Sequence, residues 1–126
     1  MEEQTNLKKI EIGTIDKPML EPKTVKIVDV EIRFVEKVKT NKVVCIVQHP
    51  NSDDVIEISA AKVESGKDKI KVVGLWVIID KEQKLDKNSA TAKLLRFLNC
   101  RTIEELAGKS CQTTEDDLGY LVFKAY

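Results

Sequence analysis

The feature that most constrains this chain is a change in the spacing of its apolar residues. Between residues 24 and 80 they either alternate with polar residues, the spacing of a half-buried strand, or form the short apolar runs of a covered strand. Between Ser89 and Asn99 they recur every three or four positions, the spacing of one helix face. The 126 residues suffice for one domain. We therefore expect a disordered N-terminus over residues 1–7 and a single domain over residues 8–126, with strands preceding helices.

Strands are predicted from the N-terminal part of the chain onward. Lys8–Gly13 alternates apolar and charged residues and is typical of a short or edge strand. Thr24–Val38 has apolar residues at the even positions from 28 to 34 and charged residues between them, which predicts a long strand with one wet face. A hairpin turn follows at Lys39–Lys42, where Asn41 best tolerates a left-handed backbone. Val43–Gln48 is apolar on both faces, which indicates a central strand.

Two further strands are predicted before the helices. Val55–Val63 carries small residues at positions 59–61, where another element can approach closely. Lys69–Asp80 is the most hydrophobic of the predicted strands, and its Gly74 predicts a bulge or a barrel corner.

The helices are predicted by their caps as well as by their periodicity. Ser89–Asn99 is amphipathic, and Asn88 or Ser89 can cap its free N–H groups. Thr102–Glu105 has the sequence of a capping box, and Gly108 stands where a C-cap is expected. A second short helix of about two turns is therefore predicted.

A closing hairpin is predicted from Lys109–Thr114 and Tyr120–Ala125, joined by an acidic turn. The element order predicts an α+β fold, either an antiparallel β-meander or a partly open β-barrel, with a helical pair before the C-terminal hairpin. The OB-fold is the nearest named architecture, because its helix follows three strands and precedes two. This chain has one predicted strand too many before its helix.

Charge and hydropathy exclude several classes of partner. The 21 Lys and Arg residues balance the 21 Asp and Glu residues, so the basic domain typical of duplex or anionic-membrane binding is missing. No apolar run approaches the ~20 residues that cross a bilayer. The N-terminus is acidic and polar, unlike a signal or transit peptide. We expect a cytoplasmic protein with no membrane partner.

Chemistry-bearing motifs are scarce. Three cysteines are expected to be reduced and buried, although a disulfide between Cys100 and Cys111 remains the alternative. His49, the single histidine, follows Cys45 by four residues, about 13 Å along a strand and too far for direct proton transfer. His49 is interpreted as a turn residue. No metal, cofactor, catalytic residue or enzymatic activity is predicted.

Lysines in the predicted turns are the strongest candidates for a binding surface. They can hold phosphates while an exposed aromatic side chain stacks a base. Phe34, Trp76 and Phe97 occupy apolar faces and are expected in the core, whereas two tyrosines are free to stack. The alternative is that these lysines decorate solvated turns and protect strand edges. The candidate nucleic-acid-binding residues are Lys37, Lys39, Lys42, Lys67, Lys69, Lys71, Tyr120 and Tyr126.

The final third of the chain resembles a known group of proteins. Residues 92–99, AKLLRFLN, precede residues 102–109, TIEELAGK, and a closing hairpin. This order is similar to the C-terminal part of small phage and archaeal accessory proteins in single-strand-binding-like families. The resemblance implies an archaeal or viral source and DNA or other nucleic-acid binding, and it assigns no site residue.

Two functions are therefore predicted. The first is a non-enzymatic module that binds single-stranded nucleic acid through the turn lysines and an exposed tyrosine. The second is a protein-interaction or structural subunit, in which a strand edge such as Lys8–Gly13 pairs with a partner or with a second copy of the chain.

Overall fold

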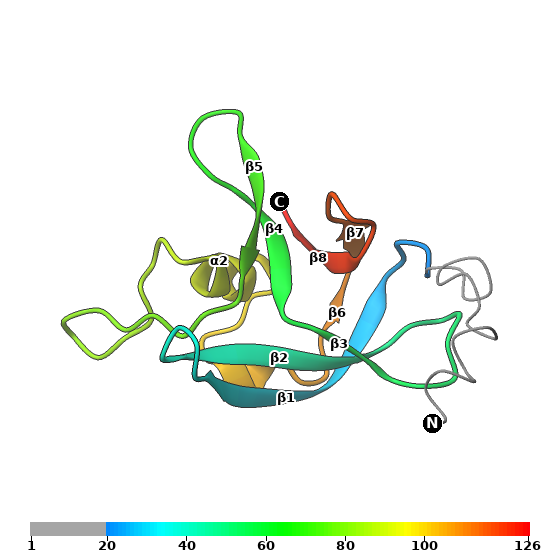
Figure 1. The fold of residues 1–126 in the computed structure, drawn as a ribbon, viewed down its shortest axis with the longest axis horizontal. Coiled ribbons are helices and arrows are strands. Elements are labelled where there is room, and N and C mark those ends of the chain that lie inside the picture. The colour runs from blue at the N-terminus through cyan, green and yellow to red at the C-terminus, as the bar shows by residue number, and fades with distance from the viewer. Residues whose placement is uncertain (1–19) are drawn as a thin grey trace, which may run out of the picture.

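The computed structural model describes residues 20–126, which form a mostly antiparallel, curled half-barrel with one short α-helix (Figure 1). One four-stranded sheet has the order β3-β2-β1-β6 and the other the order β5-β4-β8-β7. The strands are β1 (Val25–Val35), β2 (Thr40–Gln48), β3 (Ile56–Ile58), β4 (Ala60–Glu64), β5 (Ile70–Gly74), β6 (Ser110–Cys111), β7 (Thr113–Glu115) and β8 (Leu121–Ala125).

Two bent strands join the sheets. Only Ser59 separates β3 from β4, and only Gln112 separates β6 from β7. The carbonyl of Ser59 accepts a hydrogen bond of 2.9 Å from the N–H of Leu75. The carbonyl of Gln112 accepts one of the same length from the N–H of Lys124. The predicted strand Val55–Val63 is therefore one strand bent at its small residues, and both sheets wrap a common core.

The pairing of β4 with β8 is parallel, with Ala61 opposite Phe123. Every other strand pairing is antiparallel within residues 20–126. An all-antiparallel meander is therefore wrong at this one pairing. The parallel arrangement follows from the connection between the two strands, which contains β5, the helices and the β6–β7 strand and returns the chain in the same direction.

The predicted helix at residues 89–99 is confirmed as α2 (Ala90–Phe97), which begins after Ser89. The Ser89 hydroxyl accepts from the N–H of Ala92 at 3.1 Å. The second helix, η1 (Ile103–Leu106), is a single 3₁₀ turn and is shorter than predicted. The predicted capping box does not form, because the Thr102 side chain makes no cap hydrogen bond and Glu105 accepts from the N–H of Arg101 and from the Thr102 hydroxyl instead of from the N–H of Thr102.

An extra residue in β1, Val28, shifts the register with β2 and changes which alternate residues face the core. Ile27 before the bulge is fully buried, and the inward face continues afterwards at Val30. Ile32 and Phe34 lie farther along this face and are 51% and 56% exposed, because the hairpin extends beyond the core (Figure 1). The expected core position of Phe34 is therefore wrong.

The turn between β1 and β2 also differs from the prediction. The left-handed residue is Lys39, with φ 53°, not Asn41. Thr40 already begins β2, so the turn lies about three residues earlier in the chain than predicted. The central position of the second strand is confirmed, since β2 lies between β1 and β3 and buries Val43 and Val47 completely.

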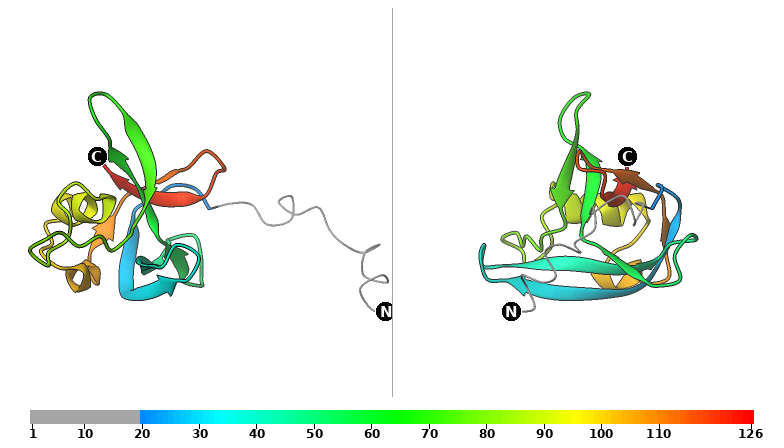
Figure 2. Two further views of the ribbon diagram at one scale, coloured as in Figure 1. Left: turned by 60° about the vertical axis from the view of Figure 1, so that its left-hand side comes forward. Right: turned by 45° about the vertical axis from the view of Figure 1, so that its right-hand side comes forward.

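Gly74 marks the predicted corner. The strand β5 ends there, and the chain continues beside β2, where Val43 donates to the carbonyl of Leu75 at 2.8 Å and Val77 to that of Asn41 at 2.9 Å. The predicted strand Lys69–Asp80 is therefore a strand only over β5, and its second half meets β2 through an isolated bridge between Trp76 and Lys42. We name the hairpin of β4 and β5, residues 60–74, the arm; it projects from the half-barrel in Figures 1 and 2.

The three cysteines are free and buried, as expected. His49 was interpreted as a turn residue, but its side chain is completely buried. Its Nδ1 accepts from the N–H of Asn51 at 3.0 Å, so its Nε2 carries the proton that is donated to the carbonyl of Glu21 at 2.7 Å. His49 thereby ties residues 20–24 to the end of β2.

Two predicted segments lie outside the described residues: the N-terminus over residues 1–7 and the strand Lys8–Gly13. Within residues 20–126 no helix has the length and apolarity needed to cross a membrane. The same residues contain no group of three or more side chains placed to hold a metal ion.

Candidate nucleic-acid interface

The candidate lysines lie on two hairpins that point in different directions (Figures 1 and 2). Lys37 and Lys39 occupy the turn between β1 and β2, and Lys42 lies in β2. The other candidates, Lys67, Lys69 and Lys71, belong to the arm. The two groups therefore form separate surfaces, whose charge and aromatic content must be compared.

Charges at the β1–β2 hairpin are largely balanced. Lys39 lies 3.7 Å from the carboxylate of Glu36, and both side chains are exposed. Arg33 makes hydrogen bonds of 2.7–2.9 Å to Glu31 on its own strand and to Glu57 on β3. Hydrogen bonding from this guanidinium lowers the pKa of the Glu57 carboxyl, which favours its charged form.

This charge network spans β2, because β2 lies between the strands that carry Arg33 and Glu57. Four of the five N–H donors of a guanidinium suffice for the observed contacts, so Arg33 has little capacity left for a phosphate. The outer face of β1, β2 and β3 is therefore a poor anion-binding surface.

Lys42 interacts with the only tryptophan of the chain. Its ammonium lies 4.9 Å from the centroid of the Trp76 ring. Such a contact holds both side chains by the attraction between the cation and the ring quadrupole. Trp76 is half-buried beside the corner at Gly74, so its expected core position is only partly right.

The arm has a different environment, because residues from β8 and α2 lie beside it. Lys62 of β4 is the register partner of Lys124 in β8. The ammonium of Lys124 lies 4.8 Å from the centroid of the Tyr126 ring. Tyr126 lines two hollows, which share this residue. The first is formed with Lys62, Ile70, Lys71, Val72 and Asp117, and the second with Glu64, Gly66, Lys93, Arg96, Phe97 and Ala125.

We define the arm surface as the charged and aromatic side chains of these two hollows together with Lys67, Asp68, Lys69 and Lys124. It contains seven cationic side chains, three carboxylates and two aromatic rings. They are Lys62, Lys67, Lys69, Lys71, Lys93, Arg96 and Lys124; Glu64, Asp68 and Asp117; and Phe97 and Tyr126. This surface is thus strongly positive in a chain whose net charge is zero.

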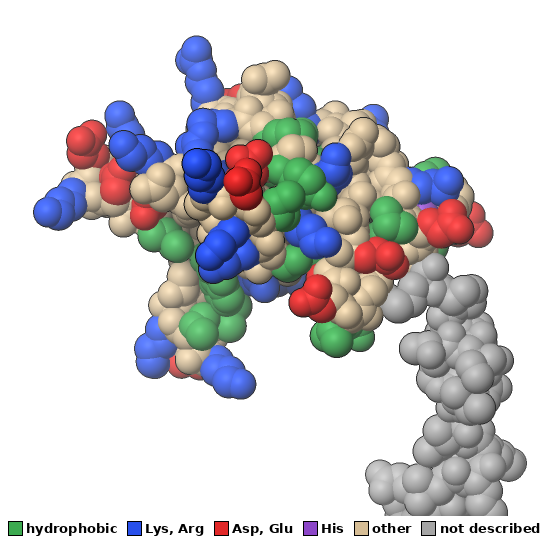
Figure 3. Space-filling view, turned by 90° about the horizontal axis from the view of Figure 1, so that it is seen from above, with side chains coloured by type: hydrophobic (Ala, Val, Ile, Leu, Met, Phe, Trp, Pro, Cys, Tyr) green, Lys and Arg blue, Asp and Glu red, His purple; other side chains and the backbone are tan. Residues whose placement is uncertain are grey.

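Figure 3 looks onto the molecule from the end toward which the arm projects. Blue Lys and Arg side chains lie around hydrophobic side chains in the middle of this face and also along its upper, left and lower edges, while the acidic side chains lie toward the edges except for one group in the middle. The arrangement can attract an anionic chain and offer it apolar rings.

The two candidate tyrosines are far apart in the fold. Tyr126 belongs to the arm surface, whereas Tyr120 is 60% exposed in the turn before β8 and lines a hollow with Leu20 and residues of β3. The turn beside Tyr120 is acidic, and Asp116 accepts there from the N–H groups of Leu118 and Tyr120. The structure therefore groups only one of these tyrosines with the lysines of the arm.

Sequence reasoning missed several members of the arm surface. Phe97 was expected in the core, but it is the last residue of α2 and is 48% exposed. Lys93 and Arg96 are three residues apart on the polar face of the same helix, a spacing that could have indicated them. Lys124 was missed because it alternates with buried neighbours, and only the parallel pairing of β4 with β8 makes it adjacent to Lys62, which belongs to the predicted lysine cluster at residues 62–71.

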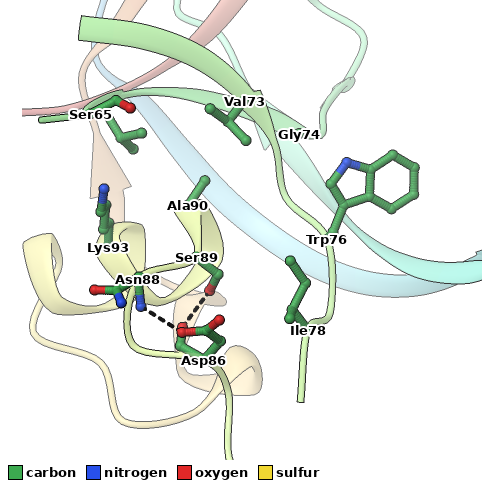
Figure 4. Close-up of a pocket in the computed structure, with 11 residues that line it drawn as sticks. Ser65, Val73, Gly74, Trp76, Ile78, Asp86, Asn88, Ser89, Ala90 and Lys93 are labelled. Atoms are coloured by element: carbon green, nitrogen blue, oxygen red, sulfur yellow. Dashed lines mark hydrogen bonds between the residues drawn. The ribbon is translucent and has the colours of Figure 1, made fainter. Parts of the chain in front are cut away.

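A third hollow lies at the base of the arm, between the corner at Gly74 and the start of α2 (Figure 4). We name it the arm-base hollow. Its volume is about 270 Å³. Its lining combines apolar side chains with polar groups from the arm turn and from the start of α2: Val63, Val73, Trp76, Ile78 and Ala90, and Ser65, Asp86, Asn88, Ser89 and Lys93.

Comparison with known proteins gives no relative: no protein-family model, curated protein or solved structure matches this chain.

Proposed function

We propose that this protein is a non-enzymatic module that binds single-stranded nucleic acid through the arm surface. The observation that carries the proposal is the excess of seven cationic side chains over three carboxylates around Phe97 and Tyr126. Cations of this kind hold phosphates, and exposed rings stack bases in a way that tolerates different sequences.

A single strand fits this surface better than a duplex does. Stacking on Phe97 or Tyr126 requires bases that are free of a partner strand. Apolar side chains at the same place, such as Val72 at 39% exposure, gain from contact with base faces and would gain nothing from a phosphate backbone.

We further propose that the half-barrel is of the OB type. Treating β3 with β4 and β6 with β7 as two bent strands leaves β1, β2, the β3–β4 strand, the β6–β7 strand and β8. The helix α2 then follows the third of these five strands and precedes the fourth, as in the OB scheme. The additional strand is β5, which pairs with β4 to form the arm.

In this interpretation the ligand does not use the outer face of β2 and β3, which is the usual site of an OB-fold. That face carries the Arg33 network with Glu31 and Glu57. The arm surface has the charge that the outer face lacks.

The test is a titration of a labelled single-stranded oligonucleotide, followed by fluorescence anisotropy at several salt concentrations. The variant Lys62→Gln/Lys124→Gln should lower the slope of log affinity against log salt by about 1.4, since each phosphate contact to a single strand contributes about 0.7. The matched variant Lys37→Gln/Lys39→Gln removes the same charge from the other hairpin and should leave the slope nearly unchanged.

Stacking is tested separately. Tyr126→Ala should weaken binding about tenfold or more, because a stacked base contributes about 1–3 kcal/mol. Tyr120→Ala, which removes the tyrosine outside the arm surface, serves as the control. Absence of binding by the unaltered protein at low salt, or an equal response to both lysine pairs, would contradict the proposal.

A protein-interaction module is the second candidate, and the edge of the arm favours it. Within residues 20–126 β5 has β4 as its one strand partner, and its Ile70 is 49% exposed. Such an edge can add a strand from another chain. A concentration-dependent dimer in sedimentation experiments that Val72→Lys abolishes, with no affinity for oligonucleotides, would favour this function.

A further inference from the structure

We propose that the arm-base hollow takes one unpaired base of the strand that the arm surface binds. This inference rests on the proposed function and extends its site from Tyr126 to Trp76.

The hollows adjoin along the inner side of the arm. Lys93 lines both the arm-base hollow and the hollow that contains Phe97 and Tyr126. The linings also include consecutive arm residues, because Ser65 belongs to the first hollow and Glu64 and Gly66 belong to the second. A strand stacked on Tyr126 can therefore continue into the arm-base hollow over Lys93.

Lys93 is suited to hold a phosphate at this boundary. Its ammonium donates one hydrogen bond, of 2.7 Å, to the carbonyl of Glu64. This contact fixes the position of the ammonium and leaves two of its three hydrogens for a ligand. A phosphate held there would place the attached nucleotide at the mouth of the arm-base hollow.

The lining favours a base over a second phosphate. Val73, Ile78 and Ala90 provide apolar walls (Figure 4). Asp86 contributes a carboxylate, whose Oδ1 accepts from the N–H of Asn88 at 2.9 Å. A carboxylate repels phosphate, but it accepts hydrogen bonds from the amino groups of bases such as cytosine. The volume of about 270 Å³ suits one planar ring system better than a larger ligand.

Trp76 lies at the opposite side of the hollow from Lys93 in Figure 4 and reports on its occupancy. As the single tryptophan, it provides the entire indole fluorescence of the protein. Its ring also contacts Lys42, at 4.9 Å from the ammonium to the ring centroid. A base in the hollow should therefore quench Trp76 or shift its emission.

The experiment titrates the full chain with oligodeoxycytidylate and with an abasic oligonucleotide of the same length. Anisotropy of the labelled strand measures binding, and Trp76 fluorescence measures entry into the hollow. We expect both strands to bind at low salt and only the strand with bases to quench Trp76. Quenching should require a strand long enough to pass Lys93, so very short oligonucleotides should bind without it.

The decisive variants are Ile78→Glu and Ile79→Glu. Both residues are exposed, at 44% and 49%, so both substitutions should leave the protein folded, but only Ile78 lines the hollow. Ile78→Glu should abolish the quenching and weaken the binding of a long strand about tenfold, whereas Ile79→Glu should do neither.

The outcomes separate the two proposals. No change in anisotropy with either strand would overturn the proposed function. Normal binding with unchanged Trp76 fluorescence, quenching by the abasic strand, or an equal effect of both glutamates would overturn the base site and leave the arm surface as the binding site.

Discussion

Replacing Gly74 by alanine should displace Trp76 without straining the backbone. An ideal Cβ at Gly74 would lie 2.7 Å from Nε1 of Trp76 and 3.3 Å from Cε of Lys42. Both atoms belong to side chains, so the indole and the lysine can move while the corner of the chain stays in place. The methyl group therefore tests whether the missing side chain of Gly74 is what allows Trp76 to pack there.

The size of the effect follows from three contributions. Loss of the contact between Lys42 and Trp76 costs about 0.5–1 kcal/mol. Forcing the indole away from its preferred rotamer costs about 0.5–1.5 kcal/mol. Alanine restricts the unfolded chain more than glycine does, which offsets about 0.4–1 kcal/mol. We expect the free energy of unfolding to fall by about 1 kcal/mol.

Urea unfolding followed by circular dichroism measures this change, and the emission spectrum of Trp76 in the folded state measures the displacement. Gly66→Ala is the matched control. Gly66 has φ +80° and no heavy atom within 4 Å of an added Cβ, so alanine there strains the backbone by about 1–2 kcal/mol without touching Trp76. Only Gly74→Ala should change the emission. An unchanged spectrum and an unchanged urea midpoint would refute the reasoning.

Three further predictions concern buried and charged groups. His49→Phe should lower the free energy of unfolding by about 2–3 kcal/mol, because the carbonyl of Glu21 and the N–H of Asn51 each lose a buried hydrogen-bond partner. Urea unfolding measures this change. Equal stability of the variant and the unaltered protein would show that these hydrogen bonds do not hold residues 20–24 to the end of β2. Burial raises the pKa of Cys45 to about 12 and that of Cys111 to about 11. Below pH 9 both thiols are protonated in the folded and in the unfolded chain, so their contribution to stability is fully present there. Above pH 9 the thiols of the unfolded chain ionise first, so the free energy of unfolding should fall by at most about 1.4 kcal/mol per pH unit for each thiol until the pH reaches its folded-state pKa. Cys45→Ala should make the pH dependence of urea unfolding shallower, and an identical slope would contradict the shift. Arg33→Met should return the pKa of Glu57 toward its ordinary value in an NMR titration, while Glu31→Gln should leave it lowered, because the hydrogen bonds between Arg33 and Glu57 remain.

Local sequence patterns predicted the elements more successfully than their surroundings. Alternation of apolar and polar residues correctly indicated β1, and the corner at Gly74 followed from a glycine within an apolar run. The cap at Ser89 was identifiable because the signal of a helix start involves residues only a few positions apart. The exposure of Phe97 could not be predicted from the sequence, since periodicity assigns a residue to a helix face but does not show where the neighbouring elements end.

The candidate site shows the same division between sequence and structure. Local sequence placed lysines in the turn of the arm, because turns at the end of a hairpin are solvated whatever the fold. It could not show that Lys39 lies beside Glu36 while the lysines of the arm have few acidic neighbours, since that balance depends on contacts across strands and hairpins.

The sequence by itself determined the order of strands and helix, the burial of the cysteines and the zero net charge, because these depend on composition and on neighbours within a few residues. Only the tertiary structure decided which charges gather. The parallel pairing of β4 with β8 places Lys62 beside Lys124, and the packing of α2 against the arm brings Phe97 to Tyr126. Such contacts join residues far apart in the chain, and their free energy comes from the closure of the whole core, not from any local pattern.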